Sequence, residues 1–325
     1  MVPSPVSRSF AVGNDEAPAS LEGGVVAIGN FDGVHRGHRA VIDLACRRAS
    51  ALKRPAAALT FSPHPRRFFK PDLPLFRLSD DRNRLRLLAA TGLDGAIVMT
   101  FNAALASTSA QDFITNILVG RFGISGAVIG FDFHFGKNRT GSPDYLREQG
   151  AAHGFSVDVA PPLEDEGRPV SSGTVRAALS EGKVVEACTL LGAPWFVSGE
   201  VIHGEKRGRE LGFPTANIRL DPACGLKHGI YAVRAAVDGK LIDGVASFGR
   251  RPTFDNGAPL LEVFLFDYAG DLYGKVIDVA FISWLRGEEK FESIDGLKRH
   301  MDTDAAQARA ALARARDAFP ALGKL

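Results

Sequence analysis

A glycine-rich run near the middle of the chain combines the residue types needed to hold a nucleotide and a metal ion. It reads GEKRGRELGFPTAN, from Gly204 to Asn217. Glycines let a backbone pass close to a ligand, and successive N–H groups in such a loop can bind an anion. The hydroxyl of Thr215 and the amide of Asn217 are hard oxygen ligands suited to Mg²⁺. The run predicts a nucleotide–metal site, with a loop shaped by Gly204, Gly208, Gly212 and Pro214.

The glycines taken alone are equally compatible with a hairpin that has a solvated, charged tip. The Pro-Thr-Ala-Asn end of the run favours the nucleotide site instead. The site differs from a Walker loop, because the pattern G-x-x-x-x-G-K-[ST] does not occur in the chain.

A second motif follows an apolar run near the N-terminus, where GNFDGVHRGH extends from Gly29 to His38. Two imidazoles in one strand-to-helix turn can converge on a phosphate, and the helix N-terminus adds N–H donors. Such a site stabilises the charge on a phosphoryl group during in-line transfer. His35 and His38 are therefore candidate catalytic residues for nucleotidyl transfer. Helix capping is the simpler alternative, and no third residue nearby has a metal-ligand spacing.

A single carboxylate, Glu262, interrupts the apolar run LLEVFLF that extends from Leu260 to Phe266. Burying an isolated glutamate is costly unless it is partnered or functional. A carboxylate within reach of a substrate hydroxyl can act as a general base. An edge or rim position in a sheet is the alternative for this residue.

The N-terminal half must position the histidines, and its pattern predicts alternating strands and helices. Strands are expected at 25–28, 56–61, 96–99, 127–130 and 156–160. Ser109 to Asp112 form a capping box before an apolar helix, and Ser142-Pro143 is a typical helix start. This alternation predicts a parallel sheet with helices on both faces, which binds ligands beyond the carboxyl ends of its strands.

The C-terminal half has the pattern of consecutive strands, at 196–202, 229–237, 240–248, 260–266 and 275–282. Asp238-Gly239 predicts a two-residue hairpin turn. An antiparallel sheet or closed barrel is expected, followed by a helix over about 293–322. The expected divisions are a flexible tail at 1–20, one domain at 21–191 and a second at 192–325.

The composition limits the function classes. The chain has 325 residues, a net charge of +2 and 23% charged residues. This charge gives no electrostatic reason to expect nucleic-acid binding. No apolar run approaches the length needed to cross a bilayer, and residues 1–20 lack a signal-peptide core. Three distant cysteines predict neither a disulfide framework nor a zinc site, and favour a reducing cytoplasm.

Several of these motifs resemble known families when they are considered together. GEKRGRELGFPTAN resembles the signature of riboflavin kinase, and the H-x-G-H turn resembles the nucleotidylyltransferase superfamily. Thr60–Pro65 (TFSPHP) and Gly130–Lys137 (GFDFHFGK) are similar to the FMN adenylyltransferase module of bacterial FAD synthetases. Val170–Arg176 (VSSGTVR) resembles a phosphate-gripping stretch of the same module. The resemblance extends from about Gly24 to the C-terminal helix.

The resemblance implies a Rossmann-like nucleotidylyltransferase domain followed by a riboflavin kinase β-barrel with a C-terminal helix. In the first domain it implies two sets of contacts. ATP and its phosphates would contact Gly29, Phe31, Asp32, Gly33, His35, His38, Ser171, Ser172 and Arg176, and FMN would contact Pro63, His64, Asp132 and Phe133. The family has Thr or Ser where this chain has Gly173, which puts that one phosphate contact in doubt. Taken singly, Pro63-His64-Pro65 is a rigid loop, Asp132 a turn residue, and the neighbouring phenylalanines one face of a core strand.

In the second domain the resemblance implies that Glu262 is the catalytic base and that Arg286 and Phe291 help to hold flavin. The blocks GRRPTF (249–254) and DYAGDLYG (267–274) resemble the same family. The implied enzyme converts riboflavin to FMN and FMN to FAD, with ATP as co-substrate and Mg²⁺ bound by Thr215 and Asn217. No nucleic-acid or membrane partner is expected, and protein partners are unknown.

Two alternatives remain at this stage. The first is a nucleotidylyltransferase for another phosphorylated small molecule, fused to a flavin-sensing barrel. The second is a flavin-binding regulatory protein whose sites have decayed. The presence of His35, His38, Thr215, Asn217 and Glu262 in one chain argues against decay.

Overall fold

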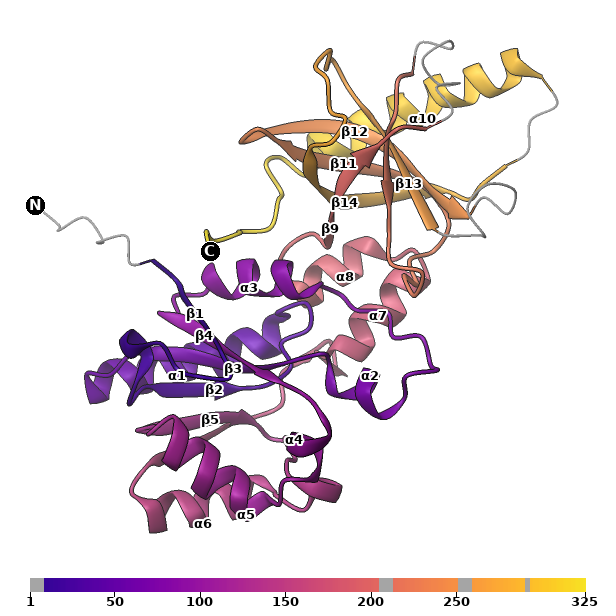
Figure 1. The fold of residues 1–325 in the computed structure, drawn as a ribbon. Coiled ribbons are helices and arrows are strands. Elements are labelled where there is room, and N and C mark those ends of the chain that lie inside the picture. The colour runs from indigo at the N-terminus through magenta and orange to yellow at the C-terminus, as the bar shows by residue number, and fades with distance from the viewer. Residues whose placement is uncertain (1–8, 205–212, 251–258, 290–292) are drawn as a thin grey trace, which may run out of the picture. The chain divides into compact units, whose positions relative to one another are not determined.

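The computed structural model describes residues 9–204, 213–250, 259–289 and 293–325 (Figure 1). Contacts divide the chain into two compact units. The first comprises Met1–Leu75, Ser79–Ser171 and Ala321–Leu325, and the second comprises Phe76–Leu78 and Ser172–Pro320. The division at Ser171 differs from the boundary expected at residue 191, because the two helices that precede the barrel are grouped with it.

The first unit is built on a six-stranded sheet in which every neighbouring pair is parallel. Its order is β1-β4-β3-β2-β5-β6. The strands are β1 (Ala11–Asn14), β2 (Val25–Ile28), β3 (Ala56–Ser62), β4 (Gly95–Thr100), β5 (Gly126–Gly130) and β6 (Ser156–Ala160). The chain reverses its direction of winding between β2 and β5, so ligands are expected at the carboxyl ends of these two strands.

The predicted parallel sheet is confirmed, but the loose tail expected at 1–20 is wrong for its described part. Ala11–Asn14 forms edge strand β1 beside β4, and a short 3-10 helix, η1 (Ala19–Leu21), follows it. Asp15 fixes this segment, since its carboxylate accepts hydrogen bonds from the backbone N–H and the hydroxyl of Thr100, both at 2.7 Å.

Helices cover the sheet on both faces. α1 (Arg36–Leu52) packs on β2, β3, β5 and β6, while α6 (Pro143–His153) packs on β6 (Figure 1). The remaining helices of this unit are α2 (Pro65–Phe69), α3 (Asp81–Ala89), α4 (Ala103–Ser107), α5 (Ala110–Asp112), the π-helix η2 (Phe113–Arg121) and the 3-10 helix η3 (Lys137–Arg139). Ser109 and Ser142 cap α5 and α6 as predicted. A two-stranded ribbon, β7 (Glu164–Asp165) with β8 (Arg168–Pro169), completes the unit.

The second unit contains a closed antiparallel barrel with the order β10-β13-β12-β11-β14-β9. Its strands are β9 (Phe196–Ile202), β10 (Ala216–Arg219), β11 (Gly229–Val237), β12 (Lys240–Arg250), β13 (Pro259–Leu265) and β14 (Val276–Arg286). Three aromatic residues fill part of its core. The ring centroid of Phe281 lies 5.2 Å from that of Tyr231 and 5.1 Å from that of Trp195. The barrel confirms the prediction, and β10 is a strand that the sequence pattern did not indicate.

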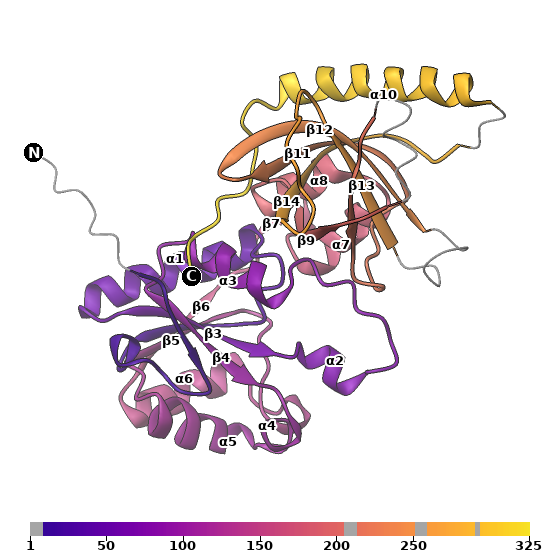
Figure 2. The same cartoon turned by 45° about the horizontal axis from the view of Figure 1, so that its top comes forward.

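Among the described residues, helices α7, α8 and α10 accompany the barrel. α7 (Ser172–Ser180) and α8 (Val184–Leu191) pack together, and α8 contacts β14. α10 (Ile294–Arg314) lies across the outside of β11, β12 and β14 (Figure 2). Arg234, which is 5% exposed, donates to the carbonyl of Ala315 at 2.8 Å and so stabilises the C-terminal end of α10. α10 ends at Arg314, before the predicted residue 322.

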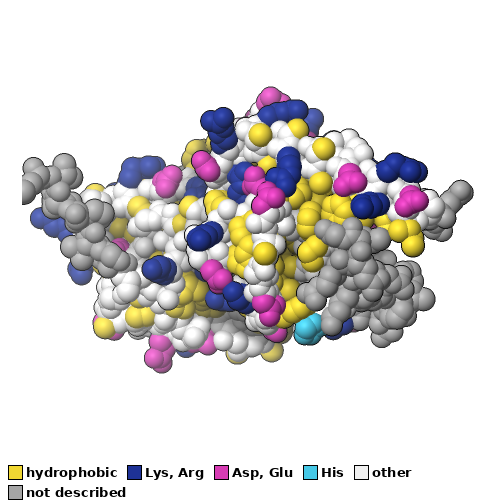
Figure 3. Space-filling model, turned by 90° about the horizontal axis from the view of Figure 1, so that it is seen from above, with side chains coloured by type: hydrophobic (Ala, Val, Ile, Leu, Met, Phe, Trp, Pro, Cys, Tyr) yellow, Lys and Arg dark blue, Asp and Glu magenta, His cyan; other side chains and the backbone are white. Residues whose placement is uncertain are grey.

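The surface carries mixed charge. On the described part of the face in Figure 3, basic and acidic side chains are interspersed with apolar ones. Within the described ranges, no helix is both long and apolar enough to cross a membrane.

Candidate functional sites

The loop from β2 to α1 is held in an unusual backbone conformation. Phe31 and Val34 have φ angles of 51° and 43°, and both side chains are buried. A positive φ is strained for bulky and β-branched residues, and such strain persists only where the surroundings fix it. Strained positions of this kind cluster at functional sites, which makes this loop the first candidate.

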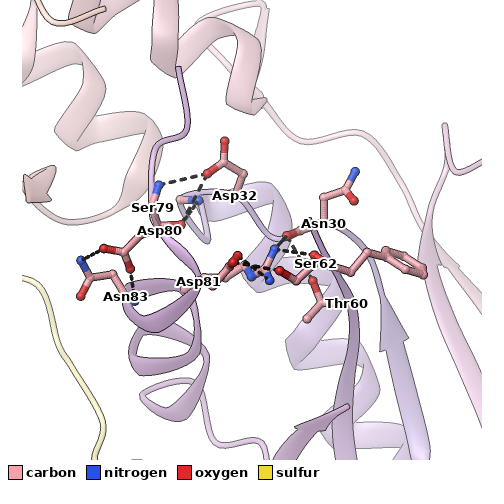
Figure 4. A network of polar contacts seen from close by, with 11 residues as sticks. Asn30, Asp32, Thr60, Ser62, Ser79, Asp80, Asp81 and Asn83 are labelled. Carbon is pink, nitrogen blue, oxygen red and sulfur yellow. Dashed lines mark hydrogen bonds and ion pairs between the residues drawn. The ribbon is translucent and has the colours of Figure 1, made fainter. Parts of the chain in front are cut away.

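Asp32 fixes the loop to the segment that precedes α3. Its carboxylate is 3% exposed and accepts the backbone N–H of Ser79 at 3.0 Å (Figure 4). The Ser79 hydroxyl in turn accepts the backbone N–H of Gly33 at 3.0 Å. Asp32, which was predicted to contact ATP, therefore has a structural role in this loop through its bonds to Ser79.

The two histidines of the H-x-G-H turn lie against each other at the start of α1. Their ring centroids are 3.6 Å apart with the planes inclined by 21°. Nδ1 of His35 accepts the backbone N–H of His38 at 3.2 Å and caps the helix. A neutral His35 therefore carries its proton on Nε2.

The position between the two histidines, Gly37, leaves little room for a side chain. A Cβ on Gly37 would lie 3.1 Å from the His35 ring and 3.0 Å from the carbonyl oxygen of Val170. The backbone of Val170 therefore passes directly beside the histidine turn, and Ser171 follows it. Arg36 also reaches this segment, since its guanidinium pairs with Asp165 at 2.6 Å. Ser171 therefore directly follows a residue whose backbone lies beside the histidine turn, and its contact with ATP phosphates stays a prediction.

Ser172 and Arg176 belong to the second unit, in the first turns of α7. The Arg176 side chain donates from Nε to the carbonyl oxygen of Phe76 at 2.5 Å. This bond orients the guanidinium through one of its nitrogens. Gly173 is exposed in the same helical turn.

The residues predicted for FMN lie after β3 and β5, at the same end of the sheet. His64 caps α2, because its Nδ1 accepts the N–H of Arg66 at 3.1 Å. Three aromatic rings form a cluster beside it, between α2 and the residue that follows β4. The ring centroids of Phe68, Phe69 and Phe101 are 5.3–5.6 Å apart. The Phe69 residue is 62% exposed. These three rings were not predicted, and their only sequence signal is aromatic residues close to the Pro63-His64-Pro65 loop.

After β5, the phenylalanines divide between core and surface. Phe133 stacks on buried Phe135 at 5.7 Å and packs against the hydrophobic core. Phe131 is 52% exposed and Asp132 is exposed beside it. The structure therefore favours Phe131, rather than the predicted Phe133, as the ring available to a ligand.

A second group of predicted residues meets on the barrel wall. Asn217 on β10 lies opposite Glu262 on β13, and Ser247 on β12 lies opposite Glu262 on its other side. Directly opposed residues in antiparallel strands present their side chains on the same face. That face is opposite to the one formed by the core residues Ile218, Leu261 and Val263, each fully buried.

Gly204 lies next to the Asn217 side chain. A Cβ on Gly204 would lie 2.5 Å from Nδ2 of Asn217, so a larger residue there would require the Asn217 amide to shift. The Asn217 side chain is 6% exposed, and its Nδ2 donates to the carbonyl oxygen of Thr215 at 3.3 Å. Thr215 is half-buried and Pro214 is exposed in the segment before β10. Gly208 and Gly212 lie outside the described residues.

Arg286, predicted to help hold flavin, is engaged by α10. Its Nε and Nη2 donate to the two carboxylate oxygens of Asp304 at 2.8 and 2.7 Å. Asp304 is 5% exposed, and its hydrogen bonds raise the pKa of Arg286. This bidentate pair fixes the guanidinium to the helix. Phe291 lies outside the described residues.

The cysteines are separate from both groups. Cys46, Cys188 and Cys224 are free thiols, and burial raises the pKa of each, to about 11 for Cys46 and Cys224. Protonated thiols are poor nucleophiles and poor metal ligands at neutral pH. No set of three His, Cys, Asp or Glu side chains converges among the described residues.

Two family models match successive parts of the chain. The FAD synthetase model matches residues 17–174, and the riboflavin kinase model matches residues 191–312. The first contains the H-x-G-H turn and the second contains the Asn217–Glu262 pair.

Similar proteins match over most of their length. Three of them are bifunctional riboflavin kinase/FMN adenylyltransferases. The protein from Pseudomonas fluorescens is 42% identical, and the match covers 89% of this chain and 93% of the relative. The protein from Escherichia coli K12 is 38% identical over 90% of this chain and 93% of the relative, and that from Bacillus subtilis is 36% identical over 87% and 91%. A solved structure titled as a macrolide-efflux protein from Streptococcus pneumoniae has a TM-score of 0.83 at 30% identity, covering 92% of this chain and 98% of that one.

Proposed function

The chain belongs to the family of bifunctional riboflavin kinase/FMN adenylyltransferases, and on that premise we propose which of its residues perform each reaction. The enzyme phosphorylates riboflavin with ATP to give FMN, and it adenylates FMN with a second ATP to give FAD and pyrophosphate. Two separate groups of residues support this assignment, one at the carboxyl end of the parallel sheet and one on the barrel wall.

The H-x-G-H turn performs adenylation. A phosphate oxygen of FMN attacks the α-phosphorus of ATP, and the bond from this phosphorus to the bridging oxygen breaks as pyrophosphate leaves. His35 donates from Nε2 and His38 binds beside it, while the N-terminus of α1 contributes N–H groups and a positive partial charge. Ser171, Ser172 and Arg176 hold the departing phosphates. Gly29 and Gly33 keep the backbone close to the nucleotide.

FMN lies across the ends of β3 and β5. The exposed rings of Phe69 and Phe131 offer flat apolar surfaces for the isoalloxazine, since offset stacking favours such pairs. Pro63, His64 and Asp132 line the approach from the two loops. Phe133 supports this surface from the core.

Glu262 is the general base of the kinase reaction. It removes the proton from the terminal ribityl hydroxyl as that oxygen attacks the γ-phosphorus of ATP and ADP leaves. Asn217 and Thr215 present hard oxygen atoms beside Glu262, which fits a Mg²⁺ ion. When bound there, Mg²⁺ neutralises the charge of the ATP phosphates. Arg286, held by Asp304, contributes to the flavin end of the site.

The domain boundary and the location are proposals of the same kind. The two family models leave residues 175–190 between them. We place the functional boundary near residue 191, with α7 serving adenylation although it packs with the barrel. The free cysteines favour a cytoplasmic location.

The observation that most directly supports this function is that one chain contains both the H-x-G-H turn and the Asn217–Glu262 pair. The test is to incubate the protein with riboflavin, ATP and Mg²⁺ and to separate the flavins by chromatography, with FMN expected first and FAD after it. Pyrophosphate release with FMN as acceptor is then compared with other phosphorylated acceptors. A faster reaction with another acceptor would support a different nucleotidylyltransferase, and flavin binding without any product would support a regulatory protein.

A further inference from the structure

A buried arginine joins the two loops that serve adenylation. Arg84 lies on α3, and its side chain is 4% exposed. Its Nη1 donates to the carbonyl oxygens of Phe61 at 3.1 Å and Asn30 at 3.3 Å, and Nη2 pairs with Asp81 at 3.1 Å. A buried charge is costly unless it is paired and hydrogen-bonded, so its position must have a compensating benefit.

The two carbonyls mark the point where neighbouring strands separate. Asn30 follows β2 and begins the loop to His35 and His38, while Phe61 lies at the end of β3, just before Pro63 and His64. Two hydroxyls reinforce the junction: that of Thr60 donates to the Asn30 carbonyl at 3.3 Å, and that of Ser62 donates to Asp81 at 2.9 Å (Figure 4). One side chain thus fixes the spacing between the nucleotide loop and the FMN loop.

The same helix holds the nucleotide loop at a second point. The segment before α3 carries Ser79, which binds Asp32 and Gly33. α3 and the segment just before it therefore hold that loop at its start through Arg84 and at its turn through Ser79. The planar guanidinium has several N–H groups in fixed directions, whereas the lysine ammonium is a compact charge that cannot span the same acceptors in this geometry.

We propose that Arg84 is a positioning residue for FMN adenylation, which sets the approach of the FMN phosphate to the α-phosphorus of ATP. It acts through the two loops and touches neither substrate. This inference rests on the proposed adenylyltransferase function. A displacement of about 1 Å between reacting groups can lower a rate by about 10²-fold while each substrate still binds.

The test compares Arg84→Lys and Arg84→Gln with the matched control Arg82→Gln, an exposed arginine on the same helix. We expect kcat for FAD formation to fall by about 10²-fold in both Arg84 variants. The affinity for FMN alone, measured by its fluorescence, and for ATP alone, measured by calorimetry, should stay within a few-fold of wild type. Riboflavin phosphorylation should be unchanged, and Arg82→Gln should behave as wild type in every assay.

Two outcomes would overturn the inference. One is an unchanged kcat in both Arg84 variants. The other is a fall in kcat that is fully explained by weaker substrate binding or by a smaller fraction of folded protein. If the Arg84 variants unfold, Ser62→Ala and Asp81→Asn weaken the same junction, and the same split between kcat and affinity is required of them. Absence of FAD formation by the wild-type enzyme would instead refute the adenylyltransferase function itself.

Discussion

Asn217 and Glu262 lie directly opposite each other on the antiparallel strands β10 and β13, so both side chains occupy one face of the barrel wall. The two residues are 45 positions apart in the sequence (262 − 217), and the strand register alone brings them together. This pairing puts a carboxylate and a side-chain amide on one face, which supports the proposed roles of Glu262 as a general base and of Asn217 as a metal ligand.

Replacing Glu262 with Gln should abolish most of the kinase activity. Gln retains the size of the side chain but cannot accept a proton, so FMN formation should fall by about 10²–10⁴-fold. Adenylation of added FMN should continue at the wild-type rate, because it uses the other group of residues. Both rates can be measured by chromatographic separation of riboflavin, FMN and FAD.

Glu200→Gln is the matched control for this change. Glu200 is an exposed glutamate on β9 of the same barrel, opposite Val276. It should leave both rates unchanged. A normal kinase rate in Glu262→Gln would exclude Glu262 as the base and make Asp271 the next carboxylate to test.

Two substitutions at His35 should separate its capping role from its chemical role. His35→Ala removes the acceptor for the His38 N–H and should destabilise the protein by about 1 kcal/mol, as loss of a helix cap does. His35→Asn restores a good cap and should recover that stability. Adenylation should fall by about 10²-fold or more in both, because neither retains the imidazole N–H.

Thermal unfolding and FAD formation measure the two effects. His153→Ala, at an exposed position on α6, serves as a surface control. If adenylation recovered in His35→Asn together with the stability, His35 would be a helix cap alone. His38→Ala should lower adenylation to a similar extent and leave riboflavin phosphorylation intact.

Arg176→Ala should raise the apparent KM for ATP in adenylation, since one phosphate-binding guanidinium is lost. The KM for ATP in riboflavin phosphorylation should not change. Initial rates of both reactions over a range of ATP concentrations provide the measurement. An unaltered KM in Arg176→Ala would leave this turn with only a structural role.

Gly173→Thr in the same turn should leave adenylation intact if only a hydroxyl is missing there, and impair it if the phosphates need close backbone approach.

Asp15 should make the edge strand β1 sensitive to acid. Hydrogen bonds from Thr100 lower the pKa of Asp15 below its ordinary value of 3.8. These hydrogen bonds stabilise the ionised carboxylate in the folded protein but not in the unfolded chain. Their contribution to the free energy of unfolding is therefore fully present above pH 3.8, and it is lost as the pH falls through the pKa of Asp15 in the folded protein. Asn accepts the same backbone conformation with positive φ, so Asp15→Asn isolates the charge. The difference in Tm between wild type and variant should be largest at neutral pH and shrink in acid, and a constant difference would contradict the assignment.

Most of the strands and the H-x-G-H turn could be predicted because their signals are local, whereas the pairing of Asn217 with Glu262 depends on strand register. The apolar runs of β2 to β6 and the H-x-G-H turn each lie within one short stretch of sequence. β1 could not be found in this way, because Ala11–Asn14 is short, alternates between half-buried and exposed positions, and depends on pairing with β4. β10 is equally short and lies against the glycine-rich run.

Arg84 shows why part of the first site could not be predicted. Arg82, Arg84 and Arg86 alternate along α3, and nothing in their local sequence distinguishes them. Only the packing of the helix buries Arg84 beneath the ends of β2 and β3. The difference in exposure between Phe131 and Phe133 could not be predicted for the same reason, since alternation along a loop does not reveal which ring reaches the core.

The chain crosses between its two compact units four times, after Leu75, Leu78, Ser171 and Pro320. The segment Phe76–Leu78 packs with the barrel unit, where Trp195 donates to the Leu78 carbonyl at 2.8 Å. The last five residues return to the first unit, where the Gly323 N–H donates to the Arg86 carbonyl at 2.9 Å. Cutting any one peptide bond between Ser79 and Pro320 therefore leaves at least one unit without part of its own packing. A gene divided at one breakpoint in this range would therefore encode two pieces, and at least one compact unit would be separated from a segment that is grouped with it.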